Sequence, residues 1–75
     1  MATETKTYRL EIGSEHAPYP ATDEEYDLQT AQRMANALHH PDWPRGRCII
    51  IRSIQTGRAV GYTERMNGRT EIRPA

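Results

Sequence analysis

Alternating apolar and polar residues predict a strand near the start of the chain. Tyr8, Leu10 and Ile12 are apolar and their neighbours are polar, which is the period of a half-buried strand. We predict this strand over residues 5–12. A stretch with two prolines follows, and it keeps the chain extended and delays the next helix.

A change of period then predicts one helix. Thr22, with Glu25 three residues later, forms a capping-box pattern, so we expect the helix to begin at Thr22. Pro41 ends it. Its narrow apolar stripe consists of Leu28, Ala31, Ala35 and Leu38. We expect His39 and His40 in the last turn, where a cation favours the negative end of the helix.

Three further strands are predicted after the helix. Residues 47–54 contain a run of isoleucines and give the clearest strand of the chain. A short glycine-containing turn leads to a strand over residues 58–65. The dipeptide Asn67-Gly68 is a strong hairpin signal, and it leads to a last strand over residues 69–73. The order β-α-β-β-β predicts a single small α+β domain over the whole chain. In it, one helix packs on one face of a mainly antiparallel sheet of three to four strands.

The opposite face of that sheet has no second helix to cover it. A two-residue turn at Thr56-Gly57 would pair Ile51 with Tyr62 beneath the helix, together with Val60. The uncovered face would then hold residues that we expect to mediate self-association: Ile50, Arg52, Ile54, Ala59 and Gly61, with Ile72 nearby. The alternative is an ordinary solvated face, because antiparallel sheets commonly expose one side to water.

Composition limits the size of the core and the class of protein. The chain has 75 residues, of which 36% are hydrophobic, and it contains no phenylalanine. No apolar run is long enough for a membrane-spanning helix, and the first residues lack the apolar stretch of a secretory signal. Cys48 is the only cysteine, so no internal disulfide can form. We therefore expect a cytoplasmic protein with a thin core and no membrane partner.

Charge is distributed unevenly although the formal net charge is zero. Residues 1–44 carry three basic and eight acidic side chains, whereas residues 45–75 carry seven arginines and two acids. We expect such a charge dipole to steer association with a partner.

Arginines also bind phosphate, so an alternative partner is a nucleic acid, which would be bound by Arg45, Arg47, Arg58, Arg65 and Arg69. Helix-end electrostatics accounts for the acids of the first predicted turn: Asp23, Glu24, Glu25 and Asp27.

Exposed aromatic, arginine and methionine side chains are the candidates for contact with a protein partner. Trp43 lies between two prolines at the corner after the helix, where it either covers the end of the core or projects as an anchor. Tyr26 is expected on the outer side of the helix. The complete candidate set is Tyr26, Trp43, Arg45, Arg47, Arg58, Arg65, Met66 and Arg69.

No catalytic or metal-binding motif appears. The potential ligands His16, His39, His40, Asp42 and Cys48 lack the paired spacing of a zinc site. Cys48 begins the most hydrophobic strand, where a thiol is more often a packing residue than a nucleophile. The five glycines are dispersed and form no phosphate-binding loop. We therefore expect no cofactor, no metal and no enzymatic activity.

The size and element order are similar to those of many phage and mobile-element accessory proteins, including small inhibitors such as anti-CRISPR proteins. This resemblance matches no motif and transfers no residues. It implies a non-catalytic protein-binding module that acts by occupying a surface on a larger protein or complex. A homodimer is the expected form of this module. The alternative is a nucleic-acid-binding accessory protein that uses the arginine-rich C-terminal hairpins.

Overall fold

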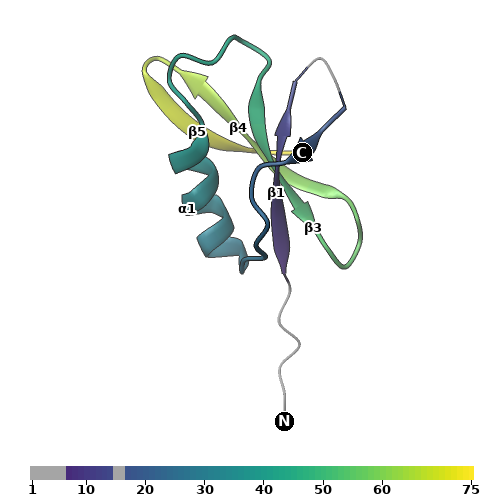
Figure 1. Cartoon of the computed structure of the whole chain (residues 1–75). Helices are drawn as coiled ribbons and strands as arrows, with labels where there is room; N and C mark the ends of the chain where they lie inside the picture. Colours follow the sequence, from purple (N-terminus) through teal and green to yellow (C-terminus); the bar gives the residue numbers. More distant parts are fainter. Residues whose placement is uncertain (1–6, 15–16) are drawn as a thin grey trace.

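The computed structural model describes residues 7–14 and 17–75 and has an α+β fold, as predicted (Figure 1). Its elements are β1 (Tyr8–Gly13), β2 (Tyr19–Pro20), α1 (Leu28–Leu38), β3 (Cys48–Ser53), β4 (Ala59–Met66) and β5 (Arg69–Pro74). The strands form one antiparallel sheet in the order β2-β1-β3-β4-β5. The predicted number of three to four strands is wrong, because residues 19–20 add a short edge strand. Residues 5 and 6 of the first predicted strand lie outside the described residues.

The helix begins later than the capping-box pattern predicts. Tyr26 forms an isolated antiparallel bridge with Tyr8, in which the two main chains exchange hydrogen bonds of 2.8 Å. The Ala21 N–H also donates to the carbonyl of Leu10 at 2.9 Å. These long-range bonds hold the segment before the helix extended, so Asp27 becomes the N-cap. The expectation of an acidic first turn is therefore wrong.

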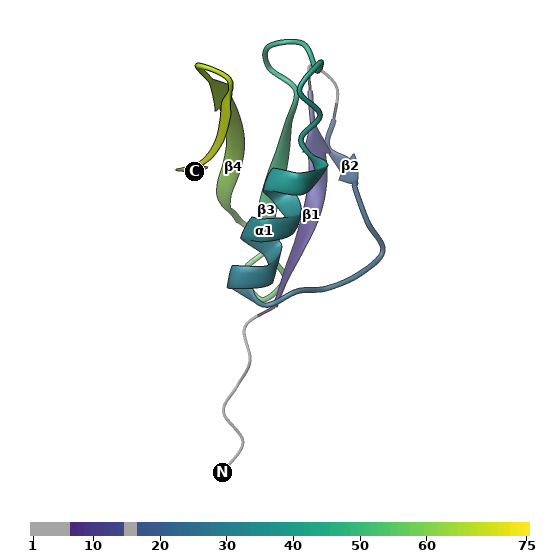
Figure 2. The ribbon, with the colours of Figure 1, turned by 90° about the vertical axis from the view of Figure 1, so that its left-hand side faces the viewer.

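The core lies between α1 and the sheet, and Figure 2 shows the helix on one side only. Leu10, Ile49 and Ile51 have at most 1% of their surface exposed, and they pack with Tyr8 and two helix alanines. Those alanines, Ala31 and Ala35, let the helix approach the sheet closely. The first residue of the predicted stripe, Leu28, stays 41% exposed.

A β-bulge between β3 and β4 overturns the predicted register. Ile51 pairs with Gly61, not with Tyr62, and the pairing shifts by one residue before Arg52 reaches Ala59. Val60 is the extra residue of the bulge. A shift of one residue exchanges the faces of a strand, so Gly61 lies beneath the helix and Tyr62 on the uncovered face.

Three residues lie on a different face from the one predicted. Gly61 is not on the uncovered face because it pairs with the buried Ile51, and a Cβ there would lie 3.1 Å from the carbonyl oxygen of Arg73 and 3.4 Å from Ile72. Ile72 pairs with Thr63 and packs against the core, so its predicted place near the uncovered face is also wrong. Val60, predicted beneath the helix, is 42% exposed.

The last hairpin forms as the sequence predicts. Asn67 and Gly68 have φ angles of 52° and 76°, the left-handed conformation that a two-residue turn requires. The turn after β3 is longer than two residues: the Ser53 N–H donates to the carbonyl of Arg58, and the Gly57 N–H donates to the carbonyl of Ser53, each at 2.9 Å. Gly57 supplies the expected positive φ of 72°.

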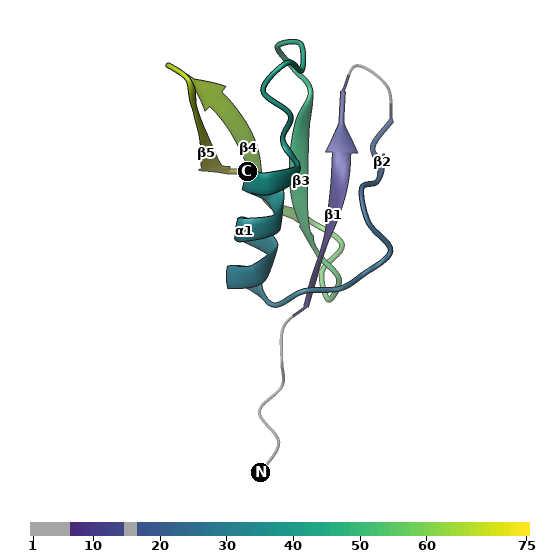
Figure 3. The same ribbon diagram turned by 60° about the vertical axis from the view of Figure 1, so that its left-hand side comes forward.

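Beyond Ile50 and Tyr62 the ladder between β3 and β4 ends. From that point the β4–β5 hairpin diverges from β3, as both Figure 1 and Figure 3 show. The loop from α1 to β3 lies beside the resulting gap. The candidate binding site lies between this loop and β4.

Candidate binding site

The loop between α1 and β3 forms a turn-rich corner. Main-chain N–H groups donate to carbonyls a few residues earlier: Trp43 to His40 and Arg47 to Pro44, each at 3.1 Å. Gly46 has a φ of 97°, which places the next residues at the start of β3. Prolines before and after Trp43 restrict the loop further. The corner therefore holds Trp43 and Arg47 in defined positions.

His39 is the C-cap of the helix and is buried, with only 7% of its surface exposed. Its Nδ1 lies 2.7 Å from Oγ1 of Thr63, and the same oxygen accepts a hydrogen bond of 2.8 Å from the Ile49 N–H. The Thr63 hydroxyl therefore bridges the main chain of β3 and the imidazole at the helix end. Burial, and secondarily the positive charge of Arg65, lowers the pKa of His39 below its ordinary value of 6.5. The lowered pKa disfavours the cation that was expected at the helix end.

Trp43 is enclosed on two sides. The centroid of its ring lies 5.1 Å from that of His39, with the rings tilted by 48°. The guanidinium carbon of Arg47 lies 5.7 Å from the Trp43 ring centroid, within the range of a cation–π contact. Trp43 is half-buried and packs against the core. Trp43 therefore covers the end of the core, and its use as an anchor for a partner stays a prediction.

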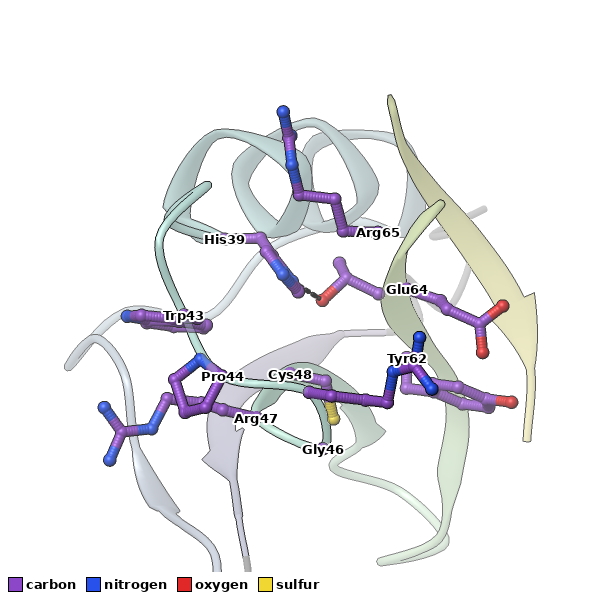
Figure 4. A pocket seen from close by; sticks show the side chains of 11 residues that line it. His39, Trp43, Pro44, Gly46, Arg47, Cys48, Tyr62, Glu64 and Arg65 are labelled. Atoms are coloured by element: carbon purple, nitrogen blue, oxygen red, sulfur yellow. Dashed lines mark hydrogen bonds between the residues drawn. The ribbon is translucent and has the colours of Figure 1, made fainter. Parts of the chain in front are cut away.

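A cavity of about 320 Å³ lies between this corner and β4. Figure 4 shows Trp43 and Pro44 on one side and Tyr62 on the other, with Cys48 at the base. The complete lining is His39, Trp43, Pro44, Arg45, Gly46, Arg47, Cys48, Tyr62, Thr63, Glu64 and Arg65. Such a volume is at the lower end for a ligand site and fits one or two amino-acid side chains.

The charge around the cavity is positive. Arg45, Arg47 and Arg65 contribute to its lining, against a single acid, Glu64. That carboxylate points away from the cavity in Figure 4 and accepts a hydrogen bond of 3.1 Å from Nε of Arg73. The three arginines therefore border a mainly uncharged interior, and in Figure 4 the side chains of Arg47 and Arg65 extend outward from it. We call this combination the Arg-rimmed cavity.

The arginines of the rim differ in how they are held. Arg65 donates to the Gly68 carbonyl at 3.1 Å and to the Thr70 hydroxyl at 3.2 Å, so its position is fixed at the hairpin. Within the described part of the chain, Nε of Arg47 is buried and has no hydrogen-bond partner. A buried donor without a partner costs free energy.

Cys48 is not placed in the cavity as a nucleophile beside His39. Burial raises the pKa of the Cys48 thiol above 9.0, which disfavours the reactive thiolate. In Figure 4 the Cys48 sulfur points away from the His39 ring, whose Nδ1 is already occupied by Thr63. Among residues 7–14 and 17–75, no three His, Cys, Asp or Glu side chains gather as metal ligands. The metal candidate His16 lies outside the described residues.

The uncovered sheet face is more polar than the sequence suggests. Glu11, on β1, is only 6% exposed, and its carboxylate forms ion pairs with two arginines. The Nε of Arg52 lies 2.6 Å from Glu11 and a nitrogen of Arg9 lies 3.3 Å from it. Ile50 is half-buried, with its Cδ1 over Gly13, while Ile54 stays 40% exposed. The isoleucine surface is therefore interrupted by ion pairs.

The structure brings together only part of the predicted partner-binding set. Trp43, Arg45, Arg47 and Arg65 gather at the cavity. Arg58 lies in the turn before β4, and Arg69 lies at the β4–β5 hairpin with Met66, which is 44% exposed. Tyr26 is not on the helix, and it is half-buried against the core with its hydroxyl 3.2 Å from Thr22.

Sequence reasoning missed Tyr62 and Thr63 as parts of the site. The alternation along β4 contained a signal, because a threonine within a partly apolar strand suggests a buried hydroxyl. The face of the sheet on which Thr63 lies, however, depends on the bulge.

Within the described residues, no helix is long and apolar enough to cross a bilayer. Comparisons with family models, curated proteins and solved structures gave no match.

Proposed function

We propose that the chain is a non-catalytic protein-binding module that engages its partner through the Arg-rimmed cavity. The observation that carries this proposal is the combination of an uncharged, partly aromatic interior with three arginines at the rim. Interface hot spots combine these features, because aromatic and arginine residues are enriched there and the surrounding contacts exclude water from a buried anchor. The partner segment that fits best inserts an apolar side chain and carries acidic residues beside it.

Charge supports an acidic partner segment. The only acid in the cavity lining is already paired with Arg73, whereas Nε of Arg47 lacks a partner among the described residues. A carboxylate can accept from a guanidinium with two oxygens, which provides direction as well as attraction. A small accessory or inhibitor protein of this kind would act by occupying a surface on a larger protein.

The second candidate is a single-stranded nucleic acid, because Trp43 and Tyr62 could stack on bases while the arginines contact phosphates. Two observations favour a protein instead. The chain has ten basic and ten acidic residues, whereas nucleic-acid-binding domains are usually clearly basic. Several arginines are also engaged in ion pairs, as for Arg52 with Glu11.

The experiment is a selection of peptides from a random displayed library on the immobilised protein. We expect enriched peptides with an apolar residue next to Asp or Glu. Their binding should weaken at least about tenfold in Arg45→Glu and Arg47→Glu, since each reverses a rim charge. Arg33→Glu is the matched control, because Arg33 is exposed on the helix away from the cavity lining.

Two results would contradict the proposal. One is a set of selected peptides whose affinity is equal in the rim variants and in the control. The other is tight binding of a labelled single-stranded oligonucleotide, measured by fluorescence anisotropy, that decreases steeply with salt and is lost in the rim variants. The second result would establish the nucleic-acid alternative.

A further inference from the structure

The two edges of the sheet differ in their capacity to pair with another strand. At one edge, β2 has only two residues, and Pro18 and Pro20 remove main-chain donors there. At the other edge, β5 is six residues long and has no proline before Pro74. Figure 3 shows β5 as the outermost strand, with no element beyond it. Open edges of this kind pair readily with another strand.

The hairpin geometry determines which groups of β5 point outward. In a two-residue hairpin the residues that flank the turn, here Met66 and Arg69, form a hydrogen-bonded pair. The alternation continues to the end of the strand, where the Ala75 N–H donates to the Val60 carbonyl. Thr70 and Ile72 therefore direct their N–H and C=O groups away from β4. These groups are available to a further strand.

We infer that β5 pairs in antiparallel orientation with β5 of a second copy of this chain, with Ile72 opposite Ile72 of that copy. A two-fold antiparallel pair must join outward-directed residues to each other, so its centre lies at Thr70, Glu71, Ile72 or Arg73. The four choices differ in the charges that they bring together.

Charge and chain length select Ile72 as the centre. Centring on Glu71 would place glutamate opposite glutamate and Arg69 opposite Arg73 of the second copy, and centring on Arg73 would place arginine opposite arginine. Centring on Thr70 would require Gly68, which is in the left-handed turn, to pair as a strand residue. With Ile72 at the centre, Glu71 lies opposite Arg73 of the second copy, and this attractive pair occurs twice by symmetry.

The side chains of β5 fit this register on both faces. Ile72 lies on the helix side and is half-buried, so the symmetric contact extends the existing core. On the other side, Arg73 already contacts Glu71 of its own chain at 3.2 Å and Glu64 at 3.1 Å. The second copy would join these into one ion-pair network across the new strand pair. This surface is distinct from the uncovered face, where the sequence predicts self-association.

A charge-exchange experiment tests the pairing and its register. We expect the wild-type chain to dimerise in native mass spectrometry and in light scattering as its concentration increases. Glu71→Arg and Arg73→Glu each place like charges opposite each other twice, so each should weaken the dimer at least about tenfold. Mixing the two variants should restore a dimer that contains one copy of each, because opposite charges then face each other.

Matched controls separate the edge from general charge effects. Glu24→Arg and Arg33→Glu make the same charge changes at exposed positions away from β5, and they should dimerise as the wild type does. Thermal unfolding of each variant shows whether it is folded. A wild-type chain that is monomeric at every concentration would overturn the inference. Single variants that dimerise like the controls, or folded variants that form no mixed dimer, would also overturn it.

Discussion

Replacing Thr63 by valine removes one hydroxyl and keeps the shape of the side chain. That hydroxyl accepts from the Ile49 N–H at 2.8 Å and contacts Nδ1 of His39 at 2.7 Å. Thr63 and Ile49 are 1% and 0% exposed, so water cannot replace the lost partner. An unsatisfied buried N–H costs about 1–3 kcal/mol, and the lost bond to the imidazole adds about 0.5–1.5 kcal/mol. We expect Thr63→Val to lower the free energy of unfolding by about 2–4 kcal/mol.

Thr63→Ser is the matched control, because it keeps the hydroxyl and loses one methyl group, which is worth about 1 kcal/mol. The assay is urea denaturation at neutral pH, followed by the fluorescence of Trp43 and by far-ultraviolet circular dichroism. A domain of this size has only about 3–5 kcal/mol from its core, so the valine variant should be close to unfolded. If the valine variant were as stable as the serine variant, the hydroxyl would not bridge the two groups, and this reasoning would be refuted.

Three further predictions concern stability. The pKa of His39 in the folded state is lowered below 6.5, so the unfolded state binds the proton first as the pH falls. The free energy of unfolding should therefore decrease below about pH 6.5. Denaturation curves measured across pH should show a flatter dependence for His39→Gln. Gly13→Ala should cost about 1 kcal/mol in thermal unfolding, since its Cβ would lie 2.7 Å from the movable Cδ1 of Ile50, and an unchanged melting temperature would contradict the close contact. Glu11→Gln should cost about 1–3 kcal/mol in urea denaturation because it weakens the half-buried pair with Arg52, whereas no loss would show that the pair contributes nothing.

Local patterns predict the elements that depend on local structure. The isoleucine-rich strand and the Asn67-Gly68 turn both appear, because alternation and positive φ are properties of neighbouring residues. The start of the helix could not be predicted in this way. Thr22 and Glu25 match a cap, but the bridge between Tyr26 and Tyr8 joins residues far apart in the sequence and holds this segment extended.

The faces of β4 show a second limit of local patterns. One bulge residue, Val60, decides whether Gly61 or Tyr62 lies beneath the helix, and alternation alone does not locate a bulge. The candidate site depends on that choice. Trp43 and its arginine neighbours are recognisable from the sequence as an exposed corner. The cavity forms only because β4 diverges from β3 after Tyr62.

We propose that the Arg-rimmed cavity is the surface that binds a partner. The most direct test of this proposal is nuclear magnetic resonance of the isotope-labelled protein during titration with an acidic peptide from the selection. We predict that the largest amide shifts cluster at residues 43–48 and 62–65, with smaller changes elsewhere. Shifts that cluster on the uncovered face around Ile50 and Arg52, with none at the cavity, would contradict the claim.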